Sequence, residues 1–139
     1  MVGTDSEEAR MSTNWPEFQR HMRESYKLAE DTPNMMSMVW TYEDGRSQKI
    51  VVRRFQAFDR DMLEFKSAFA RRDEIEPEVL LADNSRLPLA TVALSGDVYL
   101  VVYNAPADAL TVDTFEFVLS RVADVADTLE EKYCSHDDF

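Results

Sequence analysis

Apolar and polar residues alternate along several short stretches of the chain, most clearly within residues 87–104, where Ser95-Gly96-Asp97 separates two alternating runs. Glycine readily adopts the positive φ that a tight hairpin turn needs, so this stretch predicts two antiparallel strands. The second strand is apolar at both parities, because Val98, Leu100 and Val102 alternate with Tyr99, Val101 and Tyr103. Both of its faces are therefore expected to be covered, either by another element or by a second copy of the chain.

Three more strands are predicted in the first half of the chain, over residues 36–43, 48–58 and 62–69. Asp44-Gly45 is a strong hairpin signal between the first two, and Arg60-Asp61 is expected to turn the chain into the third. Sequential strands joined by short turns form an antiparallel meander. Residues such as Ile50, Val52, Leu63 and Phe65 are expected to point into the core.

Apolar residues at helical spacing predict two long helices and one short helix. Asn14 is expected to cap the first and Thr111 the last, while Pro77 starts the short one. The predicted order is α-β-β-β-α-β-β-α. This predicts an α+β fold with a five-stranded, mostly antiparallel sheet and the two long helices packed on one face.

The polar start of the chain shows no periodicity, so residues 1–12 are expected to form a disordered leader. Residues 13–133 are then a single domain, and residues 134–139 are a polar tail. The length of 139 residues fits one domain, which can bury a sufficient core without disulfides or a structural metal.

Charge narrows the possible partners. Lys and Arg total 15 against 27 Asp and Glu, which gives a net charge of -12. This acidity argues against nucleic acid and against an anionic membrane surface, and it favours a basic or amphipathic polypeptide. The single cysteine, Cys134, excludes an intramolecular disulfide, and no signal peptide or long apolar run is present. A cytoplasmic protein is expected.

Candidate chemistry is sparse. Cys134, His136, Asp137 and Asp138 could form a metal cluster, but a frayed polar tail is the favoured interpretation. His21 is interpreted as an exposed helix residue, because no nucleophile accompanies it.

Pairs of acids such as Asp59 and Asp61 are interpreted as solvated surface, and no phosphate-binding glycine loop is present. No catalytic residue, cofactor or metal is expected. The main basic positions, Arg53, Arg54, Arg71 and Arg72, could bind an acidic segment, although neutralisation of nearby acids is favoured.

Several local motifs occur in the second half of the chain. They are Asn84-Ser85-Arg86-Leu87-Pro88-Leu89, the Gly96-Asp97 hairpin, the loop before Leu110-Thr111 and the closing helix over residues 122–127. Together with the element order and the acidity, these motifs resemble the class I type III secretion chaperones and the wider YbjN-like group of bacterial proteins. The resemblance implies a non-enzymatic homodimer that binds extended segments of a partner protein.

Two surfaces are assigned, the first of them from the strand over residues 98–103 that is apolar on both faces. A homodimer interface is expected on the strand face opposite the long helices, formed by Val92, Leu94, Tyr99, Val101 and Tyr103. A peptide-binding surface is expected at the outward parity of the first two strands, formed by Met35, Val39, Val51 and Phe55. The alternative is a small dimeric regulatory or structural protein of the YbjN-like group that has no secretion client.

Overall fold

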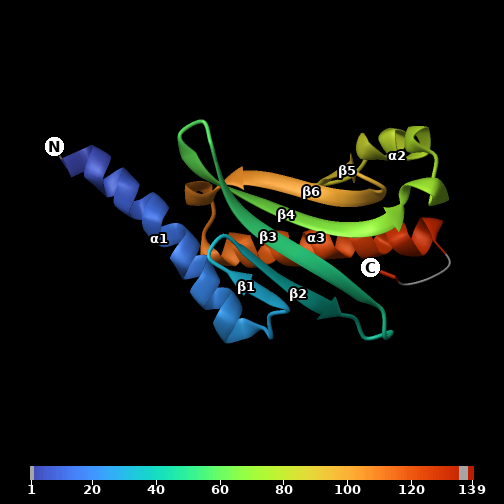
Figure 1. Ribbon diagram of the computed structural model, residues 1–139, viewed down its shortest axis with the longest axis horizontal. Coiled ribbons are helices and arrows are strands. Elements are labelled where there is room, and N and C mark those ends of the chain that lie inside the picture. The colour runs from blue at the N-terminus through green and yellow to red at the C-terminus, as the bar shows by residue number, and fades with distance from the viewer. Residues whose placement is uncertain (1, 135–137) are drawn as a thin grey trace.

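The computed structural model shows one antiparallel sheet with helices packed against one of its faces (Figure 1). Residues 2–134 and 138–139 are described. The elements in chain order are α1 (Val2–Ser25), β1 (Glu30–Thr32), β2 (Met35–Thr41), β3 (Ser47–Ala57), β4 (Arg60–Arg71), the 3-10 turn η1 (Arg72–Glu74), α2 (Pro77–Asn84), β5 (Thr91–Ser95), β6 (Val98–Pro106), the 3-10 turn η2 (Ala107–Ala109) and α3 (Val112–Tyr133).

The sheet in the described part of the chain has six strands in the order β1-β2-β3-β4-β6-β5, and every neighbouring pair is antiparallel. The predicted count of five omitted β1. This strand spans only three residues, all of them exposed, so it shows no alternation that a pattern could detect. Its backbone pairs with β2 at Glu30↔Ser37 and Thr32↔Met35.

The first helix is longer than predicted. Its backbone is helical from Val2, although residues 1–12 were expected to be a disordered leader, and Pro16 lies inside the helix. Asn14 is therefore an interior residue and not a cap, and its Nδ2 donates to the Ala107 carbonyl at 3.1 Å. The absence of apolar periodicity before Asn14 explains why the pattern gave no sign of this extension. At the last helix the prediction is confirmed, because Thr111 Oγ1 accepts from Thr114 N at 3.1 Å.

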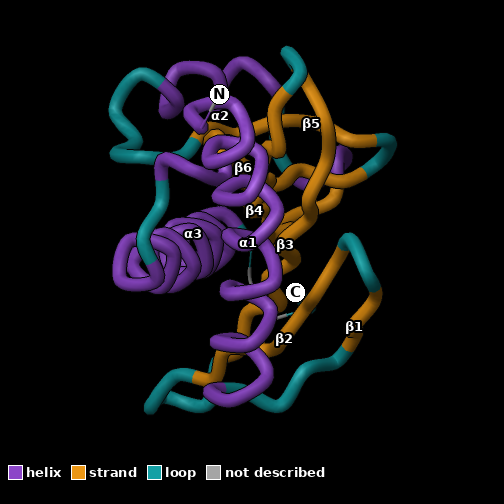
Figure 2. Tube along the Cα trace, turned by 90° about the vertical axis from the view of Figure 1, so that its left-hand side faces the viewer, coloured by secondary structure: helices purple, strands orange, loops and turns teal. Residues whose placement is uncertain are grey.

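The core lies between the sheet and α3, on what we call the inner face of the sheet (Figure 2). Ile50, Val52, Leu63 and Phe65 point inward and are fully buried, as predicted. Phe115 of α3 lies between β4 and α1. The centre of its ring is 5.2 Å from that of Phe65 in β4 and 4.6 Å from that of Phe18 in α1, on which it stacks. Offset aromatic contacts of this kind add to the free energy gained by burial, so they fix where α1 crosses α3.

The β3–β4 hairpin turns at Phe58-Asp59, two residues before the predicted position. Ala57 pairs with Arg60, and both turn residues have positive φ, +55° and +57°. Two-residue hairpins need this left-handed backbone, which Asn and Gly adopt readily and bulky side chains do not. No turn signal is present in the sequence here, because an aromatic residue occupies a position where Asn or Gly is expected.

We expect the double substitution Phe58→Asn/Asp59→Gly to stabilise the protein. Left-handed backbone costs an ordinary residue about 1–2 kcal/mol, so the free energy of unfolding should rise by about 1–2 kcal/mol in urea titrations. Phe58→Ala is the control, because it removes a ring that is 92% exposed and leaves the backbone cost in place. A double variant that is no more stable than the parent would contradict this account of the turn.

Candidate protein-binding surface

Side chains that point away from α3 form a second face of the sheet, which we call the outer face. Figure 1 looks onto it with α3 behind the sheet, and Figure 2 shows α3 on the opposite side. Strand register defines its members, because each is the neighbour of a buried inner residue. The outer face includes Met35, Val39, Lys49, Val51, Arg53, Phe55, Met62, Glu64, Lys66, Ala68, Leu100 and Val102.

The four residues predicted to bind a peptide, Met35, Val39, Val51 and Phe55, all lie on the outer face. Cross-strand pairing brings three of them together, with Val51 opposite Ser37, between Met35 and Val39 on β2, while Phe55 lies further along β3 opposite Met62 of β4. Val39 is 51% exposed, and the other three are half-buried. The structure therefore places these side chains on one accessible surface, and their role in binding stays a prediction.

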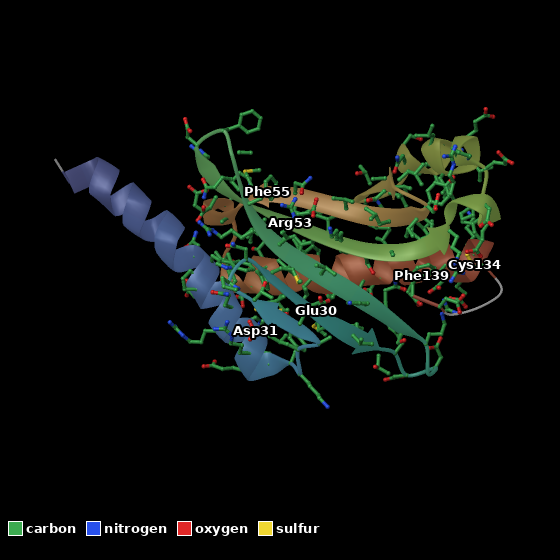
Figure 3. The ribbon with its side chains drawn as sticks, viewed as in Figure 1. Glu30, Asp31, Arg53, Phe55, Cys134 and Phe139 are labelled. Atoms are coloured by element: carbon green, nitrogen blue, oxygen red, sulfur yellow. The ribbon has the colours of Figure 1, made fainter. Side chains whose placement is uncertain are left out.

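Charged side chains cross the apolar positions of the outer face. Glu64 accepts from Arg53 Nε at 3.1 Å and lies 3.4 Å from Lys66 Nζ. The Arg53 guanidinium also lies over the Phe55 ring, 4.6 Å from its centre (Figure 3). Such long side chains cover apolar surface with their stems while the charged ends stay hydrated, so the face can meet water without a partner.

The carboxylates on this face remain ionised. Burial opposes the charge of Glu64, but the Arg53 hydrogen bond and the charges of Lys66 and Arg53 outweigh it, so the pKa of Glu64 lies below its usual range. Hydrogen bonds from Lys49 and Ser37 likewise lower the pKa of Glu30. At neutral pH the basic side chains of the outer face are therefore paired with acids.

The predicted dimer interface lies on the wrong face of the sheet. Tyr99, Val101 and Tyr103 were assigned opposite the long helices, but register with Phe65 and Ser67 puts them on the inner face. Tyr99 and Val101 are buried, and Tyr99 Oη donates to the Ile75 carbonyl at 2.9 Å. Because β6 is apolar at both parities, the sequence could not decide which face the helices cover.

Apolar side chains are exposed instead where α2 meets β5. Val79, Leu81, Leu89 and Leu94, which we call the α2–β5 patch, are between 39% and 65% exposed. A hollow of about 190 Å³ lies beside them, lined by residues that include Leu80, Leu81, Val92, Leu94 and Tyr99. Three of the residues predicted at the dimer interface thus border this hollow, while Val101 and Tyr103 lie away from it.

His21 and Asp61 contribute to contacts between elements. His21 is half-buried where α1 meets α3, and its Nε2 lies 3.4 Å from Glu116 Oε2, so it is not the exposed residue that was expected. Asp61 is buried and ion-paired with Arg54 at 3.1 Å, so it is not the solvated surface residue that was expected.

The possible metal cluster is only partly described, because His136 and Asp137 lie outside the described residues. Among the side chains that the structure describes, which are those of residues 14–134 and 138–139, no group of three or more could hold a metal ion. Cys134 Sγ lies 3.7 Å from the Phe69 carbonyl. Burial, assisted by the negative charge of Glu74, raises the pKa of the Cys134 thiol to about 11.

A buried charged cluster was missed in the sequence. Glu130 of α3 is fully buried, and Arg46 of the β2–β3 turn contacts it at 3.5 Å while donating to Asp127 at 3.0 Å. The sequence did hold a signal, since Glu130 follows Val122 and Ala126 at spacings of four and so falls on the apolar stripe of the helix. A carboxylate at such a position needs hydrogen-bond donors inside the protein.

No protein-family model matches the sequence, and no curated protein does so. Among solved structures, a chain of the HopA1–SchA chaperone–effector complex superimposes with a TM-score of 0.61 at 17% identity, over 88% of this chain and 94% of that chain. A chain of the ExsC–ExsE complex gives a TM-score of 0.54 at 12% identity, over 72% of this chain and 77% of that chain. At these identities the likeness shows the fold alone.

This likeness confirms the prediction of a chaperone-like α+β fold, while similarity to the YbjN-like group stays a prediction. The described helices include none with the length and apolar character needed to cross a bilayer.

We expect Cys134 to react slowly with thiol reagents. A pKa of about 11 leaves roughly a hundredfold less thiolate at pH 8 than an ordinary cysteine has. Disulfide-exchange rates measured by absorbance should therefore be far below those of the protein unfolded in urea, and should rise about tenfold per pH unit from pH 8 to pH 10. A native rate equal to the unfolded rate would show that the thiol is exposed.

Proposed function

We propose that the chain is a non-enzymatic, chaperone-like protein that forms a homodimer and binds an extended segment of a partner protein on the outer face. The observation that carries this proposal is the outer face itself. It combines an uncovered sheet surface, a cluster of accessible apolar side chains around Val39 and Val51, and a fold shared with a chain of a chaperone–effector complex.

The geometry of the outer face supports an extended partner. A strand lying across the face would meet apolar side chains at the spacing of alternate residues, and the long stems of Arg53 and Lys66 can shift aside to admit it. The sheet edges offer a second mode, because backbone groups at an edge strand can pair with an added strand. In the described residues β1 and β5 form the two edges.

The α2–β5 patch supports the homodimer. A cluster of exposed leucine and valine side chains next to an open edge strand is typical of an interface, and a two-fold axis would bury the same patch of both copies. This proposal moves the dimer contact from the predicted β6 face to the end of the sheet. It keeps Leu94 and Val92 at the contact, and the buried Tyr99 lines the hollow beside them.

A dimeric structural or regulatory protein without a client is the alternative. It would use the α2–β5 patch in the same way and bind no extended peptide on the outer face. The two candidate functions therefore differ in one measurable property, which is peptide binding that depends on β2 and β3.

The first test selects binders from a library of short random peptides and measures their affinity for a Val39→Asp variant. A charge placed against an apolar peptide side chain should weaken binding by about tenfold. Phe117→Asp is the matched control, because Phe117 is 53% exposed on α3, close to the 51% of Val39. Peptides that bind both variants as well as the parent, or a library that yields no binder, would sink the client-binding proposal.

The second test concerns the dimer. Leu81→Glu should convert the protein to monomers at tens of micromolar, because Leu81 is the most exposed member of the α2–β5 patch. Light scattering gives the mass directly, and Val39→Glu serves as a control outside the patch. A monomeric parent at this concentration, or a Leu81→Glu variant that remains dimeric, would contradict the proposed interface.

A further inference from the structure

β3 and β4 separate at one end of the sheet. Their backbone pairing runs from Ala57↔Arg60 to Val51↔Lys66 and includes no pair between residues 47–50 and 67–71, a region that we call the strand gap. Side chains bridge part of it, since Gln48 Nε2 donates to Ser67 Oγ at 2.9 Å and Ser67 Oγ donates to Lys49 O at 2.5 Å. The strand gap therefore leaves backbone groups of β3 for a segment other than β4.

Residues 138–139 of the same chain occupy the strand gap. The N–H of Lys49 donates to a backbone oxygen of Phe139 at 2.9 Å. On the other side, Glu130 Oε2 accepts from Asp138 N at 3.0 Å and from Phe139 N at 3.2 Å. All of these bonds join backbone groups of the docked segment, so they hold it in an extended form and leave its side chains for further contacts.

The Phe139 side chain adds an aromatic contact. Asp138 and Phe139 border a hollow of about 250 Å³ that is otherwise lined by Lys49, Val51, Lys66, Ala68 and Leu100 of the outer face. Figure 3 shows Phe139 beside the ends of β3 and β4. The hollow is therefore continuous with the surface proposed to bind the partner.

Cations surround the docked segment. The Arg71 guanidinium lies 3.2 Å from the Asp138 carboxylate and 5.5 Å from the centre of the Phe139 ring. Lys49 and Lys66 line the same hollow. Because Lys49 and Lys66 are already paired with Glu30 and Glu64, the Arg71 contacts are the ones that favour an acidic residue next to an aromatic one in the strand gap.

We propose that the strand gap is a binding site for an extended partner segment carrying an acidic residue followed by an aromatic residue, and that Asp138 and Phe139 are an intramolecular occupant of the same site. This inference rests on the proposed function, because it locates one anchor of the partner on the outer face. The docked segment and the partner then exclude one another.

Because Glu130 is buried, we expect binding of the partner segment and release of residues 138–139 to occur as one exchange. Its carboxylate is fully buried and takes two of its hydrogen bonds from the docked segment. Departure of residues 138–139 without a replacement would remove two of the donors to a buried carboxylate, which is costly. A partner segment that presents its own N–H groups restores them, so binding of the correct partner is what releases the tail.

The test uses a fluorescein-labelled peptide of sequence Ser-His-Asp-Asp-Phe, which copies residues 135–139. It is titrated by fluorescence anisotropy against the full-length parent and a full-length Phe139→Ala variant. A tethered segment competes at an effective concentration in the millimolar range, so the peptide should bind the variant about tenfold more tightly than the parent. Equal affinity for the two proteins, or binding to neither, would overturn the proposal.

Two controls sharpen this result. A peptide with alanine in place of its phenylalanine should lose the affinity, and a Phe58→Ala protein should behave like the parent, because Phe58 is an exposed aromatic residue outside the strand gap. If Phe139→Ala unfolds the protein, as judged by circular dichroism, the same peptide is added in excess to the ¹⁵N-labelled parent. The amide signals of Lys49 and Phe139 should then move, and unmoved signals would overturn the proposal.

The outcome is separable from that of the peptide-library test. Library peptides that lose affinity for Val39→Asp while the tail peptide fails to bind Phe139→Ala would leave the proposed function standing and reject only the strand gap. Binding of the tail peptide to Phe139→Ala without any library binder would reject the binding of clients on the outer face and leave the strand gap as a site for residues 138–139.

Discussion

Burial of the inner face of the sheet beneath α3 is the interaction on which the rest of the structure depends. Phe65, Phe115 and Phe18 form a continuous aromatic contact from β4 through α3 to α1, so the position of each helix follows from the face that the strands present. α2 completes this layer at the far end through Leu80. The helices cover only the inner face. The surface that the outer face presents to solvent or to a partner is therefore made of strand side chains alone.

The outer face meets this requirement with long charged side chains laid over apolar ones. Glu64, Arg53 and Lys66 pair with one another across β3 and β4 while their stems cover Phe55 and its neighbours. Exposed ion pairs contribute little to stability, so they can separate at small cost in free energy. The same side chains that keep the face hydrated when no partner is bound can therefore separate and move aside when an apolar ligand binds.

The sequence was sufficient for the fold class and for much of the candidate surface. Strict alternation in β2 and β3 placed Met35, Val39, Val51 and Phe55 on one face, as the register confirms. It failed at β6, where Val98 and Tyr99 are equally apolar and only tertiary packing selects the face. It also failed at β1 and at the docked tail, because backbone pairing between polar residues distant in sequence leaves no periodic pattern.

The two edges of the sheet differ in a way that limits self-association. β1 carries Glu30 and Asp31 on a strand of only three residues, and short acidic edges discourage pairing with another copy of themselves. β5 lies beside the apolar α2–β5 patch and has no such protection. Under the proposed dimer contact, copies of the chain would therefore join at one end of the sheet and not at both. A contact of this kind would close on itself as a pair and would not propagate into a fibre of continuous sheet.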